Sequence, residues 1–143
     1  MAKAEALDTV LVAIDRSALS LAEMDFLNLL SLRPDSLVVL AHVMSDPVAA
    51  ADQVDRPHEI SDDQYQTIEE QLQNLGDRLT CDYEIEIVRG DPADELVGLA
   101  RRHRAELIVI GSRGLTGMDR IIQGSVSTEV VEAAPCSVLV IKQ

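Results

Sequence analysis

The stretch LIVIGSRGLTG, residues 107–117, joins a wholly apolar run to a glycine-rich turn. Four consecutive aliphatic residues suit a short strand, and a strand without polar positions is covered on both faces, as in a parallel sheet. Glycines directly after such a strand let backbone N–H groups approach an anion closely. The stretch therefore predicts a central strand of an α/β domain, with an anion-binding turn at its carboxyl end.

Outward from this stretch, strand-like runs alternate with helix-like periods along the whole chain. The other expected strands are 9–15 (TVLVAID), 37–43 (LVVLAHV), 83–88 (YEIEIV) and 137–141 (SVLVI). The helical stripes between them are Leu19, Ala22, Phe26 and Leu30; Ile68, Leu72, Leu75 and Leu79; Leu96, Leu99, Ala100 and His103; and Val126, Val130, Ala133 and Ala134. We expect Arg33-Pro34-Asp35 to stop the first helix, Asp91 to cap the third, and a long functional or mobile loop over 45–58.

Strands that alternate with helices pair in parallel through right-handed crossovers, with helices on both faces of the sheet. The continuous apolar runs at 9–15 and 107–110 belong in the centre, and the alternating run at 83–88 belongs at an edge. Residues 1–143 are thus predicted to form one doubly wound domain with a five-stranded parallel sheet of order 3-2-1-4-5. Its topological switch lies between the first and fourth strands, and ligands bind there, at the carboxyl ends of the strands.

The composition excludes several classes of function. The chain has 143 residues, 47% of them hydrophobic, and a formal net charge of −13. This acidity argues against a nucleic-acid or anionic-membrane surface. No apolar run is long enough to span a membrane and no signal peptide is visible, so a cytoplasmic location is expected. Cys81 and Cys136 lack metal-ligand spacing and are interpreted as reduced, mostly buried thiols.

Two features fall at the predicted switch. Asp15 ends the first strand, and the glycine-rich segment after the fourth strand leads through Gly124-Ser125-Val126-Ser127 into a helix. The free N–H groups and dipole of that helix favour a phosphate, and Arg113 adds a positive charge. Neither a Gly-Lys-Ser/Thr phosphate loop nor the dinucleotide fingerprint after the first strand is present.

The remaining polar candidates have simpler interpretations. His42 lies in an apolar run and is interpreted as a packed strand-end histidine. His103 is interpreted as a polar or cationic group near a helix C-terminus. The sequence offers no general base with an orienting partner, and so no catalytic residue and no protein-held metal are predicted.

Over essentially its whole length, the chain resembles a universal stress protein domain. The first strand with Asp15-Arg16-Ser17, the pair His42-Val43 and the triplet Gly90-Asp91-Pro92 are each similar to a family motif. The most specific match is Gly111-x2-Gly114-x9-Gly124-Ser125, the spacing of the ATP-binding branch. The usual glycine after the aspartate is Arg16 here, which either narrows the pocket or reaches a phosphate.

The resemblance implies a site for ATP, with Mg²⁺ bridging the phosphate oxygens. Its implied nucleotide-binding residues are Ala13, Asp15, Val43, Ile110, Gly111, Arg113, Gly114, Gly124, Ser125, Val126 and Ser127. It also implies a homodimer through the edge strand 137–141. The expected function is nucleotide-dependent regulation of a stress response. The alternatives are a slow Mg-dependent ATPase and a nucleotide-free partner-binding module, and ATP against AMP stays open.

Overall fold

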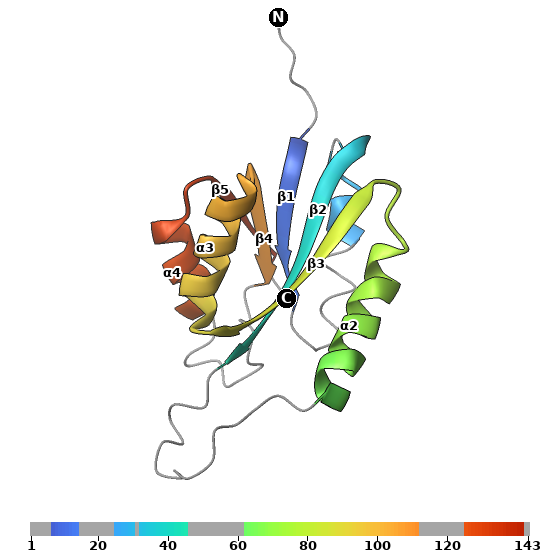
Figure 1. Cartoon of the computed structure of the whole chain (residues 1–143). Helices are drawn as coiled ribbons and strands as arrows, with labels where there is room; N and C mark the ends of the chain where they lie inside the picture. Colours follow the sequence, from blue (N-terminus) through green and yellow to red (C-terminus); the bar gives the residue numbers. More distant parts are fainter. Residues whose placement is uncertain (1–6, 15–24, 31, 46–61, 112–124, 142–143) are drawn as a thin grey trace, which may run out of the picture.

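The computed structural model describes residues 7–14, 25–30, 32–45, 62–111 and 125–141. The chain order is β1 (Leu7–Ala13), β2 (Leu32–Ser45), α2 (Asp62–Gly76), β3 (Asp82–Gly90), α3 (Pro92–His103), β4 (Leu107–Gly111), α4 (Ser125–Ala133) and β5 (Ser137–Ile141). All neighbouring strands pair in parallel, in the order β3-β2-β1-β4-β5 (Figure 1). The predicted doubly wound sheet and its strand order are therefore confirmed.

Two apolar clusters cover the two faces of the sheet. On one face, alternate strand residues such as Leu11 and Ile108 pack with Leu96 of α3 and Val130 of α4. On the other face, the intervening strand residues pack with Ile68 and Leu72 of α2 and with Leu27. Figure 1 shows α3 and α4 on one side of the sheet and α2 on the other. In the described part of the chain, no helix is long and apolar enough to cross a membrane.

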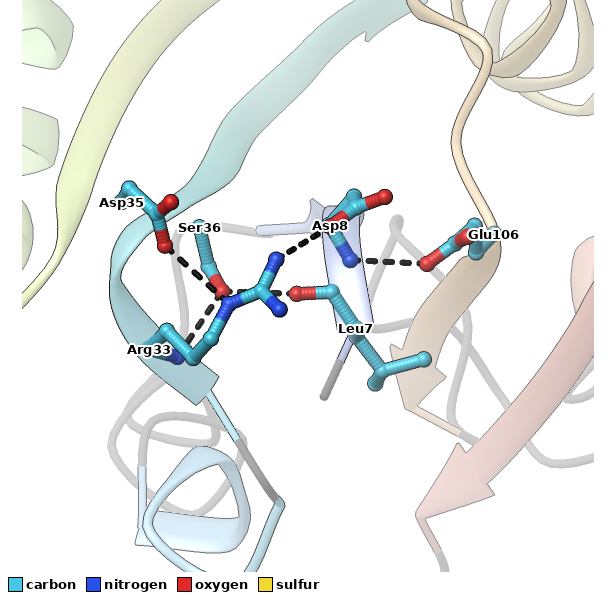
Figure 2. Close-up of polar contacts among 6 residues, drawn as sticks. All are labelled: Leu7, Asp8, Arg33, Asp35, Ser36 and Glu106. Carbon is cyan, nitrogen blue, oxygen red and sulfur yellow. Dashed lines mark hydrogen bonds and ion pairs between the residues drawn. The ribbon is translucent and has the colours of Figure 1, made fainter. Parts of the chain in front are cut away.

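β2 contains a bulge close to the amino-terminal ends of β1 and β2. Leu7 pairs with Leu32, but Thr9 pairs with Leu37, so two steps along β1 match five along β2. Ser36 closes the extra residues: its hydroxyl accepts a hydrogen bond from the Arg33 N–H at 2.9 Å and donates one to the Leu7 carbonyl at 2.6 Å (Figure 2). Beyond the bulge, the two strands pair in one regular register from Thr9 with Leu37 to Ala13 with Ala41.

Charged side chains surround this bulge on its exposed side. Figure 2 shows the Arg33 guanidinium between Asp8 at 2.6 Å and Asp35 at 3.1 Å, while Glu106 accepts a hydrogen bond from the Asp8 N–H at 2.7 Å. The three side chains of the ion pairs are each at least half exposed, and pairs of that kind contribute little to stability. The buried Ser36 hydroxyl, which joins β1 to β2 by its two hydrogen bonds, therefore stabilises the bulge more than these ion pairs do.

Helix α3 begins and ends where local chemistry predicts. The Asp91 side chain accepts a hydrogen bond from the Asp94 N–H at 3.0 Å, with Pro92 at the first helical position. Arg104 ends the helix in the left-handed conformation, at φ 56°. Gly90, just before the cap, has φ 147°, a conformation that favours glycine. The Asp-Pro start predicted from the sequence is confirmed.

Two expectations about the first third of the chain are wrong. Phe26 was expected on the inner face of the first helix, but it is 38% exposed while Leu27 is 2% exposed. Arg33-Pro34-Asp35 was expected to stop that helix, yet described helical residues end at Leu27 and these three residues belong to β2. A bulged strand accommodates proline because its extra residues are outside the regular ladder. Beyond Ser45, the expected long loop lies outside the described residues.

Candidate functional site

The carboxyl ends of β1 and β4 lie side by side at the topological switch. Val12 of β1 pairs with Val109 of β4, one step or two before each strand ends. β2 and β3 lie on one side of this pair of strands, and β5 lies on the other side. A doubly wound sheet forms its binding crevice where the strand order diverges in this way. The sequence-predicted location of the site is therefore at the switch that the fold contains.

The described apolar residues of the predicted site come together. Ala13, Val43 and Ile110 lie within the last three residues of three adjacent strands and are 1%, 3% and 0% exposed. They belong to one apolar cluster, and Val126 in the first turn of α4 packs against it. These four residues, Ala13, Val43, Ile110 and Val126, form an apolar wall below the strand ends. A flat apolar group such as a nucleobase suits a wall of this kind.

The amino terminus of α4 supplies the polar half of the arrangement. The helix begins at Ser125, as predicted, and its nine residues carry no acidic side chain in the first turn. The first N–H groups of a helix lack intrahelical acceptors, and the helix dipole is positive at that end. Ser127 in the same turn is only 6% exposed. The start of α4 is thus electrostatically suited to an anion.

His42 holds the end of β1 against β2. Its Nδ1 lies 2.8 Å from the Ile14 carbonyl oxygen, and the Ile14 N–H donates a hydrogen bond to the Ala41 carbonyl at 2.8 Å. Because a carbonyl only accepts hydrogen bonds, the proton of this contact is on Nδ1. His42 is 7% exposed, which confirms that it is a packed histidine. Its contact with the Ile14 backbone, directly before Asp15, has no signature in the sequence beyond a histidine in an apolar strand.

Several predicted site residues lie outside the described residues. They are Asp15, Arg16, Arg113, Gly114 and Gly124. Gly111, the first glycine of the spacing motif, is described and ends β4. The assignment of the undescribed residues to the site remains a prediction from the sequence.

Both cysteines are poor candidates for site chemistry. Burial raises the pKa of the Cys81 thiol, and the neighbouring Asp82 charge raises it further. Burial likewise raises the pKa of Cys136. Since the thiolate is the reactive form, both groups are less nucleophilic at neutral pH than a free cysteine. Both cysteines are free, as predicted, but each is only partly buried, so the expectation of mostly buried thiols is wrong.

Known proteins share the family profile and the fold of this chain. The profile of the universal stress protein family matches residues 6–142. A universal stress protein of Methanocaldococcus jannaschii is 47% identical over 58 residues, which are 41% of this chain and 34% of that protein. One of Synechocystis is 34% identical over 77 residues, 54% of this chain and 47% of that protein. The matched segments thus span between a third and a half of these relatives.

Solved structures resemble the chain over nearly its whole length. Universal stress protein UspA from Lactobacillus plantarum superimposes with a TM-score of 0.76 at 24% identity, covering 96% of this chain and 99% of that one. A universal stress protein in complex with cAMP gives a TM-score of 0.67 at 25% identity, covering 96% and 98%. Together with the strand order and the profile match across residues 6–142, these findings show that the chain belongs to the universal stress protein family.

Proposed function

We propose that this protein binds ATP at the β1–β4 switch and acts as a cytoplasmic, nucleotide-dependent regulator of a stress response. The observation that carries the proposal is the position of α4. This helix begins at Ser125, fourteen residues after Gly111, carries no acidic residue in its first turn, and packs through Val126 on the apolar wall. An apolar wall beside an anion-binding helix start matches the two ends of an adenine nucleotide.

Three observations support a nucleotide over another anion. A structural relative with the same fold was solved in complex with cAMP. The spacing Gly111-x2-Gly114-x9-Gly124-Ser125 is that of the ATP-binding branch. The adenine would lie against Ala13, Val43 and Ile110, and the phosphates against the start of α4. Mg²⁺ would be held through the phosphate oxygens, and the first turn of α4 carries no acidic residue that would repel those oxygens.

We propose that the binding of ATP to the site carries the signal, and that fast hydrolysis of ATP does not. The sequence contains no Gly-Lys-Ser/Thr phosphate loop, and no catalytic residue is predicted from it. Backbone donors and Mg²⁺ alone stabilise some transition-state charge, so slow hydrolysis is the second candidate function. A single-turnover assay with purified protein distinguishes the two functions. Regulation by nucleotide binding predicts that bound ATP stays unhydrolysed for many minutes. Release of product several times a minute contradicts it.

A glycine substitution tests the site itself. Gly114→Leu would place a side chain where the backbone has to approach the phosphates, so calorimetric titration with Mg-ATP should show at least a tenfold weaker affinity. Gly98→Leu is the matched control, because a Cβ added at Gly98 meets no atom within 4 Å and the new side chain starts in open space. Equal affinity in both variants contradicts the site. Absence of binding in the unmodified protein favours the nucleotide-free partner-binding module.

Titrating ADP, AMP and cAMP against the same protein settles which adenine nucleotide it prefers. If the start of α4 binds the terminal phosphates, affinity should fall in the order ATP, ADP, AMP. An equal affinity for all of them would restrict recognition to the adenine and the first phosphate.

Arg16 replaces the glycine that the family usually carries after the aspartate. Arg16→Gly separates its two possible roles. Weaker ATP binding in the variant identifies a charge clamp on a phosphate, and tighter binding identifies a side chain that narrows the pocket.

We also propose a homodimer through β5. This strand is at one end of the sheet order, and its central residues are only partly buried in the single chain. An apolar edge with unpaired backbone groups favours pairing with a second copy about a twofold axis. Sedimentation at micromolar concentrations should give twice the 15.6 kDa mass of the chain. A monomer mass at all concentrations contradicts the dimer.

A further inference from the structure

Two glutamates of β3 face the end of α3. Residues two apart on a strand point to the same face of the sheet, and Val88, the next residue in that series after Glu84 and Glu86, packs in the cluster beneath α3 and α4. The intervening residues Ile85 and Ile87 pack in the opposite cluster. Glu84 and Glu86 therefore project to the side of the sheet that α3 covers.

His103, the last residue of α3, meets both carboxylates. Its Nε2 is 2.7 Å from Oε2 of Glu86, and its Nδ1 is 3.9 Å from Oε1 of Glu84. The imidazole is 14% exposed and the Glu86 side chain 24%, whereas the Glu84 side chain is 56% exposed. One ligand atom from each residue can be chosen so that all three lie within 4.8 Å of one another. The sequence interpretation of His103 as a polar group near a helix end missed both of these partners.

This arrangement brings more acceptors together than a neutral imidazole can satisfy. A neutral histidine carries one N–H, so when Nε2 donates to Glu86 the Nδ1 lone pair faces the Glu84 carboxylate. Two carboxylates in a partly buried position also repel each other. The carbonyl end of α3 and the net charge of −13 add negative potential. A cation shared by the three groups relieves each of these conflicts.

We propose that Glu84, Glu86 and His103 bind a divalent transition-metal ion of the Zn²⁺ type, at a site distinct from the nucleotide site. Imidazole with carboxylates is a donor set that Zn²⁺ prefers. Tetrahedral Zn²⁺ with bonds of about 2.0–2.2 Å needs ligand atoms about 3.4 Å apart. The three ligand atoms lie within 4.8 Å of one another, so binding would require the carboxyl groups to rotate towards the ion. The ion takes the place of the proton between His103 and Glu86, and the exposed Glu84 leaves the fourth position open to water.

Arg102 supplies an internal competitor for this site. Its Nη1 lies 3.9 Å from Oε2 of Glu86, and its side chain is 63% exposed. The guanidinium can therefore turn to solvent when an ion binds. A purely structural bridge between α3 and β3 would lose a supporting ion pair if Arg102 were removed. A metal site would instead bind Zn²⁺ more tightly without the competing guanidinium. Titration of the Arg102 variant with Zn²⁺ therefore tests the metal site directly, whereas a purely structural bridge predicts only a lower free energy of unfolding.

The test is calorimetric titration of the tag-free full chain with Zn²⁺, with ¹H–¹⁵N spectra of the histidine rings as a second readout. Glu84→Gln keeps the size of an exposed side chain and so preserves the fold, and His103→Gln removes the nitrogen ligand. Glu129→Gln, an exposed glutamate of α4, and His58→Gln, an imidazole from another segment, are the matched controls. Arg102→Gln removes the competing charge.

The expected result is one equivalent of Zn²⁺ bound by the unmodified chain, with a shift of the His103 ring signals. Affinity should fall at least about tenfold in Glu84→Gln and His103→Gln, as for lost groups around other metal sites. It should rise in Arg102→Gln and stay unchanged in both controls. Equal affinity in Glu84→Gln and the unmodified chain, or loss of binding in His58→Gln, would overturn the proposal. Neither outcome depends on whether ATP binds.

Discussion

Replacing Ser36 by alanine removes both hydrogen bonds that close the β2 bulge. The hydroxyl is fully buried, and its loss leaves the Arg33 N–H and the Leu7 carbonyl without these partners. Each loss of a partner in a partly buried position costs on the order of 1–1.5 kcal/mol, so the free energy of unfolding should fall by about 2–3 kcal/mol. With an unfolding entropy of about 2.1 cal/mol/K per residue, the melting temperature should fall by roughly 7–10 °C.

Urea denaturation followed by circular dichroism measures this change. Ser137→Ala is the control, because Ser137 begins β5 with an exposed side chain and its loss should cost less than about 0.5 kcal/mol. The slope of the transition should be the same in all three proteins, because the area exposed on unfolding does not change. A loss in Ser36→Ala no larger than that in Ser137→Ala would refute the role assigned to the Ser36 hydroxyl.

Three further predictions concern the ends of α3 and the two thiols. Asp91→Ala removes the helix cap and should lower the free energy of unfolding by about 1 kcal/mol in urea titrations, and an unchanged midpoint would argue against the cap. Gly90→Ala should cost about 1–3 kcal/mol, because φ is 147° and the new Cβ would lie 2.8 Å from Oε2 of Glu95; full stability would contradict this. Since their pKa values are raised, Cys81 and Cys136 should react with a thiol reagent at pH 8 more slowly than glutathione, and faster as the pH rises; rates equal to those of glutathione at pH 8 would contradict this.

The strand order could be predicted because the burial of each strand is written in its own composition. The strand predicted at 9–15, with its apolar run at 10–14, and the apolar run at 107–110 became the central strands β1 and β4, and the alternating run at 83–88 became the edge strand β3. β5 is the exception: its apolar run SVLVI lies at the other edge of the sheet, so composition alone does not distinguish it from a central strand.

Local details of the first third of the chain could not be predicted in the same way. The phase of a helical stripe depends on which turn meets the sheet, and Leu27 took the inner position expected for Phe26. The β2 bulge depends on a single hydroxyl between two strands, and a lone serine such as Ser36 has no periodic signature. Tertiary contacts decided both, and they are not visible in spacing.

The candidate site was predictable to a similar extent. Ala13, Val43, Ile110 and Val126 were implied by the family resemblance, and the fold places all four in or against one apolar cluster. The Glu84, Glu86 and His103 cluster was not predicted, because the glutamates were interpreted as the solvent face of an edge strand. Only the packing of α3 on β3 shows that Glu86 is largely covered.

The two ends of the sheet differ in what they would offer to another chain. The β5 end carries SVLVI, whereas the β3 end carries Asp82, Glu84, Glu86 and Arg89. A copy approaching the β3 end would set like charges opposite one another across the new strand pair, which is unfavourable. Assembly through β5 would therefore stop at two subunits. This asymmetry would keep a dimer paired through β5 from extending into fibres through β3.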